Sequence, residues 1–509
     1  MDKAIAVIDI GMTNKKVAVY DPSLKVLDSV SRGFAPILVE GLETHDLAGM
    51  EAWFLDTIAA FAKRFPIGAI AVTTHGATTV CVGEDGEPCA PCVLYTHEPG
   101  EDFQARFYAA MGDPSELQAF TGTPRLSAMI NPSKGLFFLK ERFPEAYANS
   151  RAVLNYPQYW GFRLTGKSGA EGTYTGCHTY LWDWKAERYS SVAEKLGIAR
   201  MMPFPLRSSW DVLGTVKPEI AKRAGIDRST IVTMGIHDSN ASLLPHLAKR
   251  SGGDFILNST GTWCVLMHPQ ERFCFAPEEL GKVVFFNRSA YNKPVKTAIF
   301  LGGMEYEAWT KAIRGACGIA ASEPIPEPSE ADYRAAVASR SDFILPEVVP
   351  GSGQFPGQAA RASRGGSYYA LGDIVSGARV PAFLREPRKA LAALNLSLAM
   401  QTLVALERAG LGPRTEVFTE GGFRRNSGYN AVLAAALGGG RSGGAYLTDI
   451  AEATAFGAAM TAAAALGGTE PGALDSLFEI DYKRVLPMEG LEALDAYRSA
   501  WVGAMDRDA

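Results

Sequence analysis

Residues 5–14 read Ile5-Ala6-Val7-Ile8-Asp9-Ile10-Gly11-Met12-Thr13-Asn14. The apolar run predicts a buried strand that ends in an acid and a tight glycine turn, and Lys16–Tyr20 predicts a returning strand. A turn with so little bulk can bring backbone N–H groups close to a phosphate. Asp9 can hold Mg²⁺ through oxygen ligands or water. The same residues are also typical of an ordinary hairpin, so the choice depends on the rest of the chain.

Length and composition restrict the class of protein. The chain has 509 residues, which exceeds one ordinary core and predicts two domains. A hydrophobic content of 47% and a charged content of 21% are globular values. The net charge of −5, without a basic run, argues against a nucleic-acid partner. We expect neither a signal peptide nor a stretch of the roughly 18 apolar residues that spans a membrane, and therefore predict a cytoplasmic protein without a membrane partner.

The cysteines give no framework for disulfides. Seven of them are scattered along the chain, which is typical of reduced thiols in the cytoplasm. Cys89-Ala90-Pro91-Cys92 has the spacing of a redox or metal-binding pair. No second pair or nearby His–Cys set completes a zinc site there, which disfavours a metal role.

One structural device occurs twice. A strand, a small polar glycine turn and a returning strand are expected around 9–14, and again around Ser259-Thr260-Gly261-Thr262 between strands at 253–258 and 262–268. Two short strand pairs before the first helix, at 47–65, differ from the alternation of a dinucleotide-binding fold. Duplicated nucleotide-binding folds would give this pattern, and two such turns across a cleft can hold one triphosphate. A strand at 91–95, a loop at 351–366 and a long helix at 390–410 are also expected.

Six motifs follow one another in a characteristic order. They are Asp9-x-Gly11-x-Thr13-Asn14, Thr74-His75-Gly76, Gly235-Ile236-His237-Asp238, Ser259-Thr260-Gly261-Thr262, Thr419-Glu420-Gly421-Gly422 and Glu452-x-x-x-x-Gly457-Ala458-Ala459. From residue 5 to about 465 the chain resembles the FGGY family of carbohydrate kinases, part of the actin-like ATPase superfamily. The resemblance implies an α/β fold of two actin-like (ribonuclease H-like) domains, each a mixed sheet flanked by helices, with a cleft between them. It implies a sugar-binding domain at 1–245, a nucleotide-binding domain at 246–470 and a C-terminal extension at 471–509 that packs on the body.

Asp238 is the expected catalytic residue. It follows the expected strand Ile231–Met234 in a glycine-containing turn. A sugar hydroxyl has a pKa far above 7, so phosphoryl transfer is helped by a carboxylate that accepts its proton. The resemblance assigns this role of general base to Asp238. An Asp at this place can also cap the next helix, and both roles can hold together.

The resemblance further implies that the chain binds ATP and Mg²⁺. Asp9 would position the metal ion, with Asp238 as a second metal-binding candidate. The phosphate groups would lie against Thr13, Asn14 and Lys15 on one side, and against Thr260, Gly261 and Thr262 on the other. Gly421 and Gly422 would let the adenine and ribose lie flat against backbone, and Asn426 corresponds to an adenine-contacting position. Gly302-Gly303 fits either the nucleotide cleft or a plain helix entry.

The sugar-binding side departs from the family pattern. His75 and Gly76 follow a strand where the family places substrate contacts, and His237 neighbours the expected base. The position of a usual family Asp corresponds to His97, a usual Arg is missing, and Glu98 is a candidate substitute that could bind two hydroxyls. The Gly235–Asp238 motif is most similar to the rhamnulokinase and fuculokinase side of the family, which acts on 6-deoxy ketohexoses.

We therefore predict an ATP-dependent sugar kinase. It would transfer the γ-phosphoryl group to a hydroxyl of a small ketose, such as a 6-deoxy ketohexose or a pentulose, or of a polyol. One alternative is an ATP-driven binding or regulatory protein of the same superfamily without sugar turnover. Another is a kinase for small carboxylates. Such an enzyme needs a positively charged anchor such as Arg in its pocket, and the absence of the usual arginine counts against it. The sugar and ATP are the expected partners, and formation of a homodimer is left open.

Overall fold

The computed structural model describes residues 3–505 and divides the chain into two compact units. The first unit contains the residues up to 253 together with 269–295 and 450–480, and the second contains 254–268, 296–449 and the residues from 481 onward. Neither unit is continuous in sequence. The predicted domain limits at 245 and 470 follow the order of the motifs and stay predictions.

The first unit is built on a mixed sheet. Its hydrogen-bonded order is β13-β14-β6-β1-β2-β3, with β15 also paired to β6. β1 is antiparallel to β2, and β2 to β3, whereas β1 is parallel to β6, and β6 to β14 and β15. The bounds of these strands are β1 (Ala4–Ile10), β2 (Asn14–Tyr20), β3 (Val26–Gly33), β6 (Ile67–Thr74), β13 (Val212–Thr215), β14 (Ile231–Thr233) and β15 (Ile236–His237).

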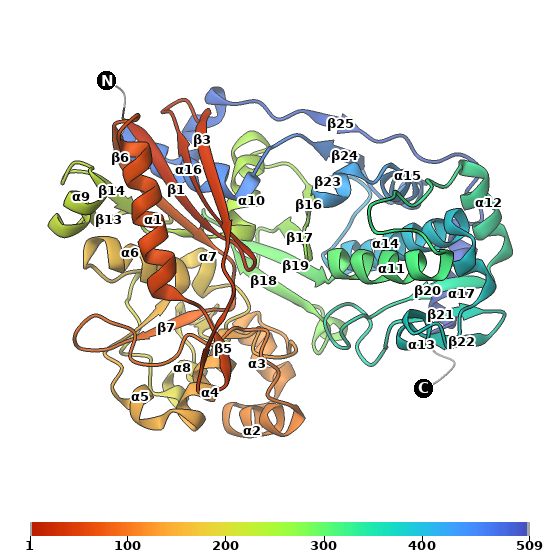
Figure 1. Cartoon of the computed structure of the whole chain (residues 1–509), viewed down its shortest axis with the longest axis horizontal. Coiled ribbons are helices and arrows are strands. Elements are labelled where there is room, and N and C mark those ends of the chain that lie inside the picture. The colour runs from red at the N-terminus through yellow and green to blue at the C-terminus, as the bar shows by residue number, and fades with distance from the viewer. Residues whose placement is uncertain (1–2, 506–509) are drawn as a thin grey trace. The chain divides into compact units, whose positions relative to one another are not determined.

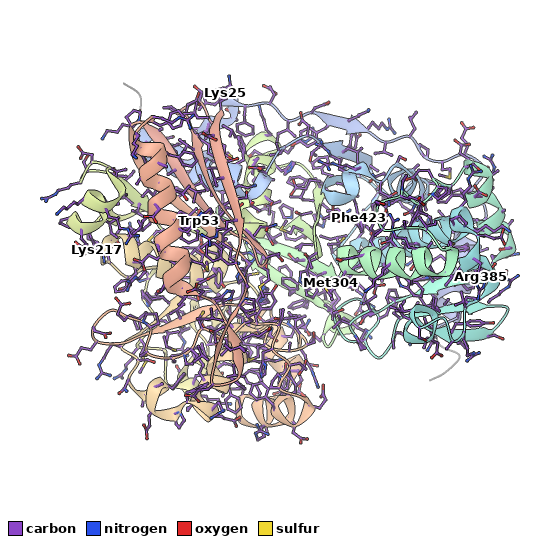
Figure 2. The ribbon with its side chains drawn as sticks, viewed as in Figure 1. Lys25, Trp53, Lys217, Met304, Arg385 and Phe423 are labelled. Atoms are coloured by element: carbon purple, nitrogen blue, oxygen red, sulfur yellow. The ribbon has the colours of Figure 1, made fainter. Side chains whose placement is uncertain are left out.

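Helices cover both faces of this sheet, which explains the continuous apolar run in β1. Ala6 and Ile8 belong to the core shared with α1 (Leu47–Ala62), α6 (Tyr156–Thr165) and α9 (Pro218–Ala224). Ile5 and Val7 belong to the core shared with α10 (Asp238–Lys249) and α16 (Ala453–Gly467). Successive residues of a strand point to opposite faces, so a strand covered twice loses its polar alternation. Figure 1 shows α1 along the red strands, and Figure 2 labels Trp53 on it.

The rest of the first unit is largely helical and has its own core, which includes Phe103, Phe107 and Leu136. Its helices are α2 (Glu101–Met111), α3 (Pro114–Thr121), α4 (Pro132–Arg142), α5 (Pro144–Ala148), α7 (Gly172–Thr175), α8 (Ser191–Leu196) and η1 (Pro277–Glu279), whereas η4 (Pro471–Leu477) packs against α10 and α16. Its short strands are β4 (Ile37–Val39), β5 (Leu42–Thr44), β7 (Thr79–Val82), β8 (Ala152–Asn155), β9 (Ala170–Glu171), β10 (Trp182–Asp183), β11 (Arg188–Tyr189), β12 (Leu206–Arg207) and β18 (Val284–Arg288).

The second unit repeats the sheet pattern of the first. β16 is antiparallel to β17 and parallel to β23, β23 is parallel to β24, and β25 is antiparallel to β24. A hairpin followed by parallel strands is the arrangement of β1, β2 and β6 as well, so the predicted fold of two mixed-sheet, actin-like domains is confirmed. The bounds are β16 (Phe255–Thr260), β17 (Cys264–Pro269), β19 (Pro294–Phe300), β23 (Glu416–Gly421), β24 (Gly444–Thr448) and β25 (Tyr482–Arg484).

A long apolar helix, α14 (Pro387–Arg408), lies in the core of the second unit. Among the described residues it is the one helix that is long and apolar enough to cross a membrane, and its burial in this core accounts for the same composition. Around it pack α11 (Gly302–Cys317), α12 (Glu330–Ser339), α15 (Ser427–Ala436) and α17 (Leu494–Gly503). The remaining elements are α13 (Leu371–Val375), η2 (Ala382–Arg385), η3 (Gly422–Arg425), β20 (Asp342–Leu345), β21 (Arg361–Arg364) and β22 (Ser367–Ala370).

Two local predictions are wrong. The end of the expected loop 351–366 is β21, which pairs with β20 and β22. Its Ala362 and Ser363 are buried, and Gly365 and Gly366 adopt positive φ in the turn to β22, so the glycines end a strand here. The expected strand 91–95 is reduced to an isolated bridge between Thr44 and Val93. Pro91 lacks a backbone N–H and cannot donate to a ladder.

Candidate active site

Three parallel strands of the first unit end at the same edge of the sheet. Thr74 of β6 pairs with Ile10 of β1 and with His237 of β15. The segments that follow these strands therefore begin side by side, and the N–H of His75 donates to the carbonyl of Ile10 at 2.9 Å. In open α/β sheets, ligands bind outside the carboxyl ends of the strands. This edge brings together the Asp9 turn, the His75-Gly76 pair and Asp238.

Asp9 is held by the first turn of α16. The Thr454 hydroxyl donates to Asp9 Oδ2 at 2.7 Å, and Lys16 Nζ lies 2.6 Å from Glu452 Oε1. Burial raises the pKa of Asp9 to about 6, and the Asp238 and Glu452 carboxylates add to the rise. The Asp238 carboxylate is thus near enough to affect Asp9, and two neighbouring carboxylates are suited to share a divalent cation.

Asp238 is the first residue of α10. Its Oδ1 accepts hydrogen bonds from the Ser239 N–H at 2.6 Å and from the Ser239 hydroxyl at 3.2 Å. The side chain keeps 29% of its surface exposed, so it remains accessible. Burial nevertheless raises the pKa of Asp238 to about 6, despite these hydrogen bonds. A carboxyl at the start of a helix, with a raised pKa and an open face, can both support the helix and accept a proton.

Three buried histidines surround Gly76. A Cβ built on Gly76 would lie 2.7 Å from His237 Nε2 and 2.9 Å from His178 Nε2. Burial lowers the pKa values of His75, His178 and His237 to about 3, so all three rings are neutral at pH 7. His75 Nε2, His178 Nδ1 and His237 Nδ1 have no hydrogen-bond partner among the described protein groups. Neutral imidazoles can donate and accept, which suits hydroxyl groups of a substrate.

His178 was missed by the sequence analysis. It follows the short helix α7 in an irregular segment and adopts a positive φ of 42°. No motif or periodicity marks it, because only tertiary contacts bring it to Gly76. The neighbouring Thr173 hydroxyl accepts the N–H of His237 at 3.0 Å, which ties α7 to the segment that carries Asp238.

His97 and Glu98 have other contacts. The His97 ring packs edge-on against Phe138 at 5.2 Å between centroids. Glu98 is exposed and accepts the N–H groups of Gly100 and Ala128, both at 3.0 Å. These bonds tie two loops together. The substrate-binding role predicted for both residues stays a prediction.

The side chain of Lys15 stabilises the turn after β1. Lys15 is buried, and its Nζ donates to the carbonyls of Gly11 at 3.0 Å and Met12 at 2.7 Å. Burial lowers the pKa of Lys15 to about 8. Thr13 and Asn14 are exposed at the tip of the turn. The groups that the turn offers to solvent are therefore those of Thr13 and Asn14, while Lys15 supports them from below.

The second unit has a comparable turn between β16 and β17. The buried Thr260 hydroxyl donates to the Glu420 carbonyl and accepts the N–H of Phe423 at 2.9 Å, so it joins the hairpin to η3. Gly261 and Thr262 are exposed at the tip. This turn and the Asp9 turn belong to different units, so the predicted clamp on one triphosphate stays a prediction.

Two glycines let backbone segments approach this second turn closely. A Cβ on Gly303, at the start of α11, would lie 2.1 Å from the Gly261 carbonyl oxygen. A Cβ on Gly421, which has a φ of +79°, would lie 2.0 Å from the Thr260 carbonyl oxygen. No side chain fits at either position. Figure 2 labels Met304 next to the first of these glycines and Phe423 two residues after the second.

Asn426 is the N-cap of α15. Its Oδ1 accepts the Tyr429 N–H at 3.0 Å, and its Nδ2 donates to Asn395 Oδ1 at 2.8 Å. The predicted adenine contact of Asn426 is untested, as is that of Gly422, which is exposed at the start of η3.

The two cysteines of the Cys89–Cys92 pair have different surroundings. Cys89 Sγ lies 3.5 Å from the Ser150 hydroxyl, and Cys92 is buried in the core beside α1. Within residues 3–505, the one group of three metal-ligating side chains is Cys177, His178 and His237.

With the fold and this geometry established, comparison with known proteins identifies the class. The model of the FGGY family of carbohydrate kinases, N-terminal domain, matches residues 4–245, and that of the carbohydrate kinase FGGY C-terminal domain matches residues 252–470. The chain therefore belongs to the FGGY family of carbohydrate kinases, as its motifs predicted.

Individual relatives are distant. A xylulose kinase of Bacillus subtilis is 23% identical over 295 residues, which cover 56% of this chain and 57% of that protein. A rhamnulokinase of Halalkalibacterium halodurans is 27% identical over 137 residues, 26% of this chain and 27% of that protein. The chain thus matches between about a quarter and just over half of the length of these curated relatives. The crystal structure of a carbohydrate kinase from Novosphingobium aromaticivorans is 26% identical, with a TM-score of 0.77, and covers 99% of both chains.

Proposed function

We propose that the protein is an ATP-dependent sugar kinase with Asp238 as its general base. One observation carries the proposal: at a single edge of the first sheet, a partly exposed carboxylate lies next to neutral buried imidazoles, each with one ring nitrogen that has no hydrogen-bond partner among the described groups. Asp238 accepts the hydroxyl proton, and the oxygen attacks the γ-phosphorus of ATP in line. The histidines around Gly76 orient the remaining hydroxyls.

The residues at this edge also fit Mg²⁺. Asp9 and Asp238 offer carboxylate oxygens, and each has its pKa raised to about 6 in a site that burial makes costly for unpaired charge. When bound, the ion supplies positive charge that offsets the charge developing on the transferred phosphoryl group. The chain's own contribution is to hold Asp9 through Thr454 and to present the tip residues Thr13 and Asn14 to the phosphates.

Two observations support ATP as the nucleotide: the family to which the chain belongs and the geometry of the turn between β16 and β17. Gly261 and Thr262 present an exposed turn tip for phosphate oxygens, and Thr260 holds that turn against η3. Gly421 and Gly422 leave a surface without side chains for the adenine and ribose, next to Asn426. Lys15 supports the phosphate turn through its carbonyls, and its direct contact with phosphate remains part of the prediction.

The chemistry of the site favours a neutral sugar or polyol. A carboxylated substrate needs a cationic anchor, whereas the three histidines are neutral at pH 7. Lys15 lies close enough to lower the pKa of His75, but its Nζ donates to backbone carbonyls. The relatives are named for xylulose and rhamnulose, which are neutral ketoses. A pentulose or a 6-deoxy ketohexose is therefore the first class to test, with His97 and Glu98 as further candidate contacts.

The decisive test is Asp238→Asn, assayed as sugar-dependent ADP release with a panel of ketoses and polyols. Loss of a general base costs about 10²–10⁴-fold in rate, while ATP binding is expected to stay within a few-fold of wild type. Asp113→Asn is the matched control, because Asp113 also accepts N–H groups at the start of a helix, α3, outside the site. Full turnover by Asp238→Asn would refute the assigned base. If no sugar raised ADP release above the sugar-free rate, the alternative of an ATP-driven binding or regulatory protein would take its place.

The cytoplasmic location, the absence of nucleic-acid and membrane partners and the open question of a homodimer remain predictions from composition. Size-exclusion chromatography with light scattering would decide the oligomeric state.

A further inference from the structure

A cluster of soft metal ligands lies beside the candidate base. The ligating atoms of Cys177, His178 and His237 all lie within 4.8 Å of one another, and the three side chains are at most 9% exposed. His237 Nε2 lies 3.4 Å from Asp238 Oδ1. None of the roles assigned above requires the thiol of Cys177.

The donor set determines which cation fits. A thiolate with two imidazoles suits Zn²⁺ or Co²⁺, whereas Mg²⁺ prefers oxygen ligands. Zinc bonds of about 2.0–2.3 Å place tetrahedral ligand atoms roughly 3.5 Å apart. No pair of ligand atoms in the cluster therefore needs to approach by more than about 1 Å, which small side-chain rotations can supply. Three protein ligands leave a fourth position open.

Each of the two histidines has one ring nitrogen without a partner in the described part of the chain. His178 Nδ1 and His237 Nδ1 are buried without a hydrogen-bond partner among the described groups. A buried polar nitrogen without a partner costs free energy, so a ligand that satisfies it is favoured. Both Nε2 atoms pack against Gly76, where a Cβ would lie within 2.9 Å of them, so the glycine allows the two rings to approach each other.

We propose that Cys177, His178 and His237 form a binding site for a thiophilic divalent cation of the Zn²⁺ class, distinct from the carboxylate site for Mg²⁺. Binding forms one metal–sulfur and two metal–nitrogen bonds and releases the Cys177 thiol proton to solvent. The bound cation draws the His237 ring away from substrate and places positive charge beside Asp238. Occupancy therefore inhibits phosphoryl transfer reversibly; this consequence, unlike the binding itself, rests on the proposed sugar kinase function.

Binding is tested with Co²⁺ as the probe on the full-length, metal-free protein. We expect a thiolate-to-Co²⁺ charge-transfer band and the visible bands of a tetrahedral ion at one equivalent, both removed by added Zn²⁺ and unaffected by excess Mg²⁺. Cys177→Ser should abolish the charge-transfer band. His178→Gln should weaken affinity by at least about 10–100-fold, since even indirect supports of a metal site cost that much.

Cys81→Ser is the matched control, because Cys81 is a buried thiol of the same unit outside the cluster. It should leave the spectrum unchanged. If Cys177→Ser does not fold, as judged by thermal unfolding, His178→Gln carries the test because it leaves the thiol and Asp238 in place. Absence of the band in the wild type, or its persistence in both variants, would overturn the site.

The inhibitory consequence is measured separately. Zn²⁺ at the concentration that displaces Co²⁺ should lower sugar-dependent ADP release at least ten-fold, and a chelator should restore it. Cys177→Ser should resist this inhibition at the same ATP concentration, which controls for chelation of Zn²⁺ by ATP. Co²⁺ binding without any sugar-dependent activity would reject the proposed function but support the metal site. Sugar-dependent activity without Co²⁺ binding would reject only the metal site.

Discussion

At the scale of single residues, the site holds charged groups at a cost to stability. Burial raises the pKa of both Asp9 and Asp238 to about 6, although each carboxyl has hydrogen-bond donors. These carboxyls are therefore less stable as anions in the folded chain than in the unfolded chain. Such groups are concentrated at functional sites, where their reactivity is worth the loss of stability.

The difference in stability between Asp238→Asn and wild type should depend on pH. Below the ordinary pKa of 3.8 both states of the wild type are protonated, and the carboxyl has no net effect. Between 3.8 and about 6 the unfolded chain ionises first, so the wild type loses stability as pH rises, and the loss is complete above about 6. At pH 7.5 the free energy of unfolding of Asp238→Asn should therefore exceed that of wild type by on the order of 1–2 kcal/mol. This difference should vanish near pH 4.

Urea unfolding at the two pH values measures this difference, with Asp113→Asn as control. An equal effect of Asp238→Asn at both pH values would contradict the raised pKa.

Two adjacent lysines should behave differently. Lys15 is buried and donates to two turn carbonyls, whereas Lys16 forms a partly exposed ion pair with Glu452. Lys15→Met leaves those carbonyls without their donor and should cost about 1–3 kcal/mol in unfolding free energy. Lys16→Met should cost less than about 1 kcal/mol. Chemical denaturation measures both, and equal costs would show that Lys15 does not support the turn.

At the scale of elements, the strand ends were predictable because their signals are local. The apolar run that begins at Ile5 lies within β1 (Ala4–Ile10), and both glycine turns follow buried strands as expected. The hydrogen bond from Thr454 to Asp9 joins residues far apart in sequence, and the approach of His178 to Gly76 depends on tertiary packing. No local pattern encodes either contact, so the turns could be predicted but the residues that complete the site could not.

The start of α11 should tolerate no side chain. Gly303→Ala would place its Cβ 2.1 Å from the Gly261 carbonyl oxygen, so the helix must move away from the turn. We expect lower stability and at least ten-fold weaker ATP binding. Gly315→Ala in the same helix is the control, because a Cβ there meets nothing within 4 Å and Ala favours helix by about 1 kcal/mol. Calorimetric ATP titration and thermal unfolding compare the two variants. Normal ATP affinity in Gly303→Ala would show that this turn does not take part in nucleotide binding.

At the scale of the whole molecule, the first unit depends on a distant segment. α16 packs against α10 so closely that a Cβ on Gly457 would lie 1.9 Å from the Ala241 carbonyl oxygen. Burial of the alanine methyl groups and Met460 of α16 stabilises the unit by on the order of 5–10 kcal/mol. That amount is comparable to the net stability of an entire domain.

A chain that ends at residue 295 should therefore fail to fold compactly. It lacks residues 450–480, which removes α16, one of the two helices that cover Ile5 and Val7 of β1. We expect strong binding of a hydrophobic dye and little soluble product, and recovery when residues 450–480 are co-expressed. Co-expression of residues 482–509, which belong to the second unit, is the control. Equal recovery with both segments, or a compact fragment without either, would contradict this dependence.

The return of the chain to its first unit also sets the order of events during synthesis. The strands of the first sheet are complete once residue 237 has been added, but α16 and η4 are made only after nearly all of the second unit has been translated. One apolar face of the first sheet is therefore without α16 for most of that time. Domains usually fold as they leave the ribosome; here the earlier-made unit is the one that has to wait.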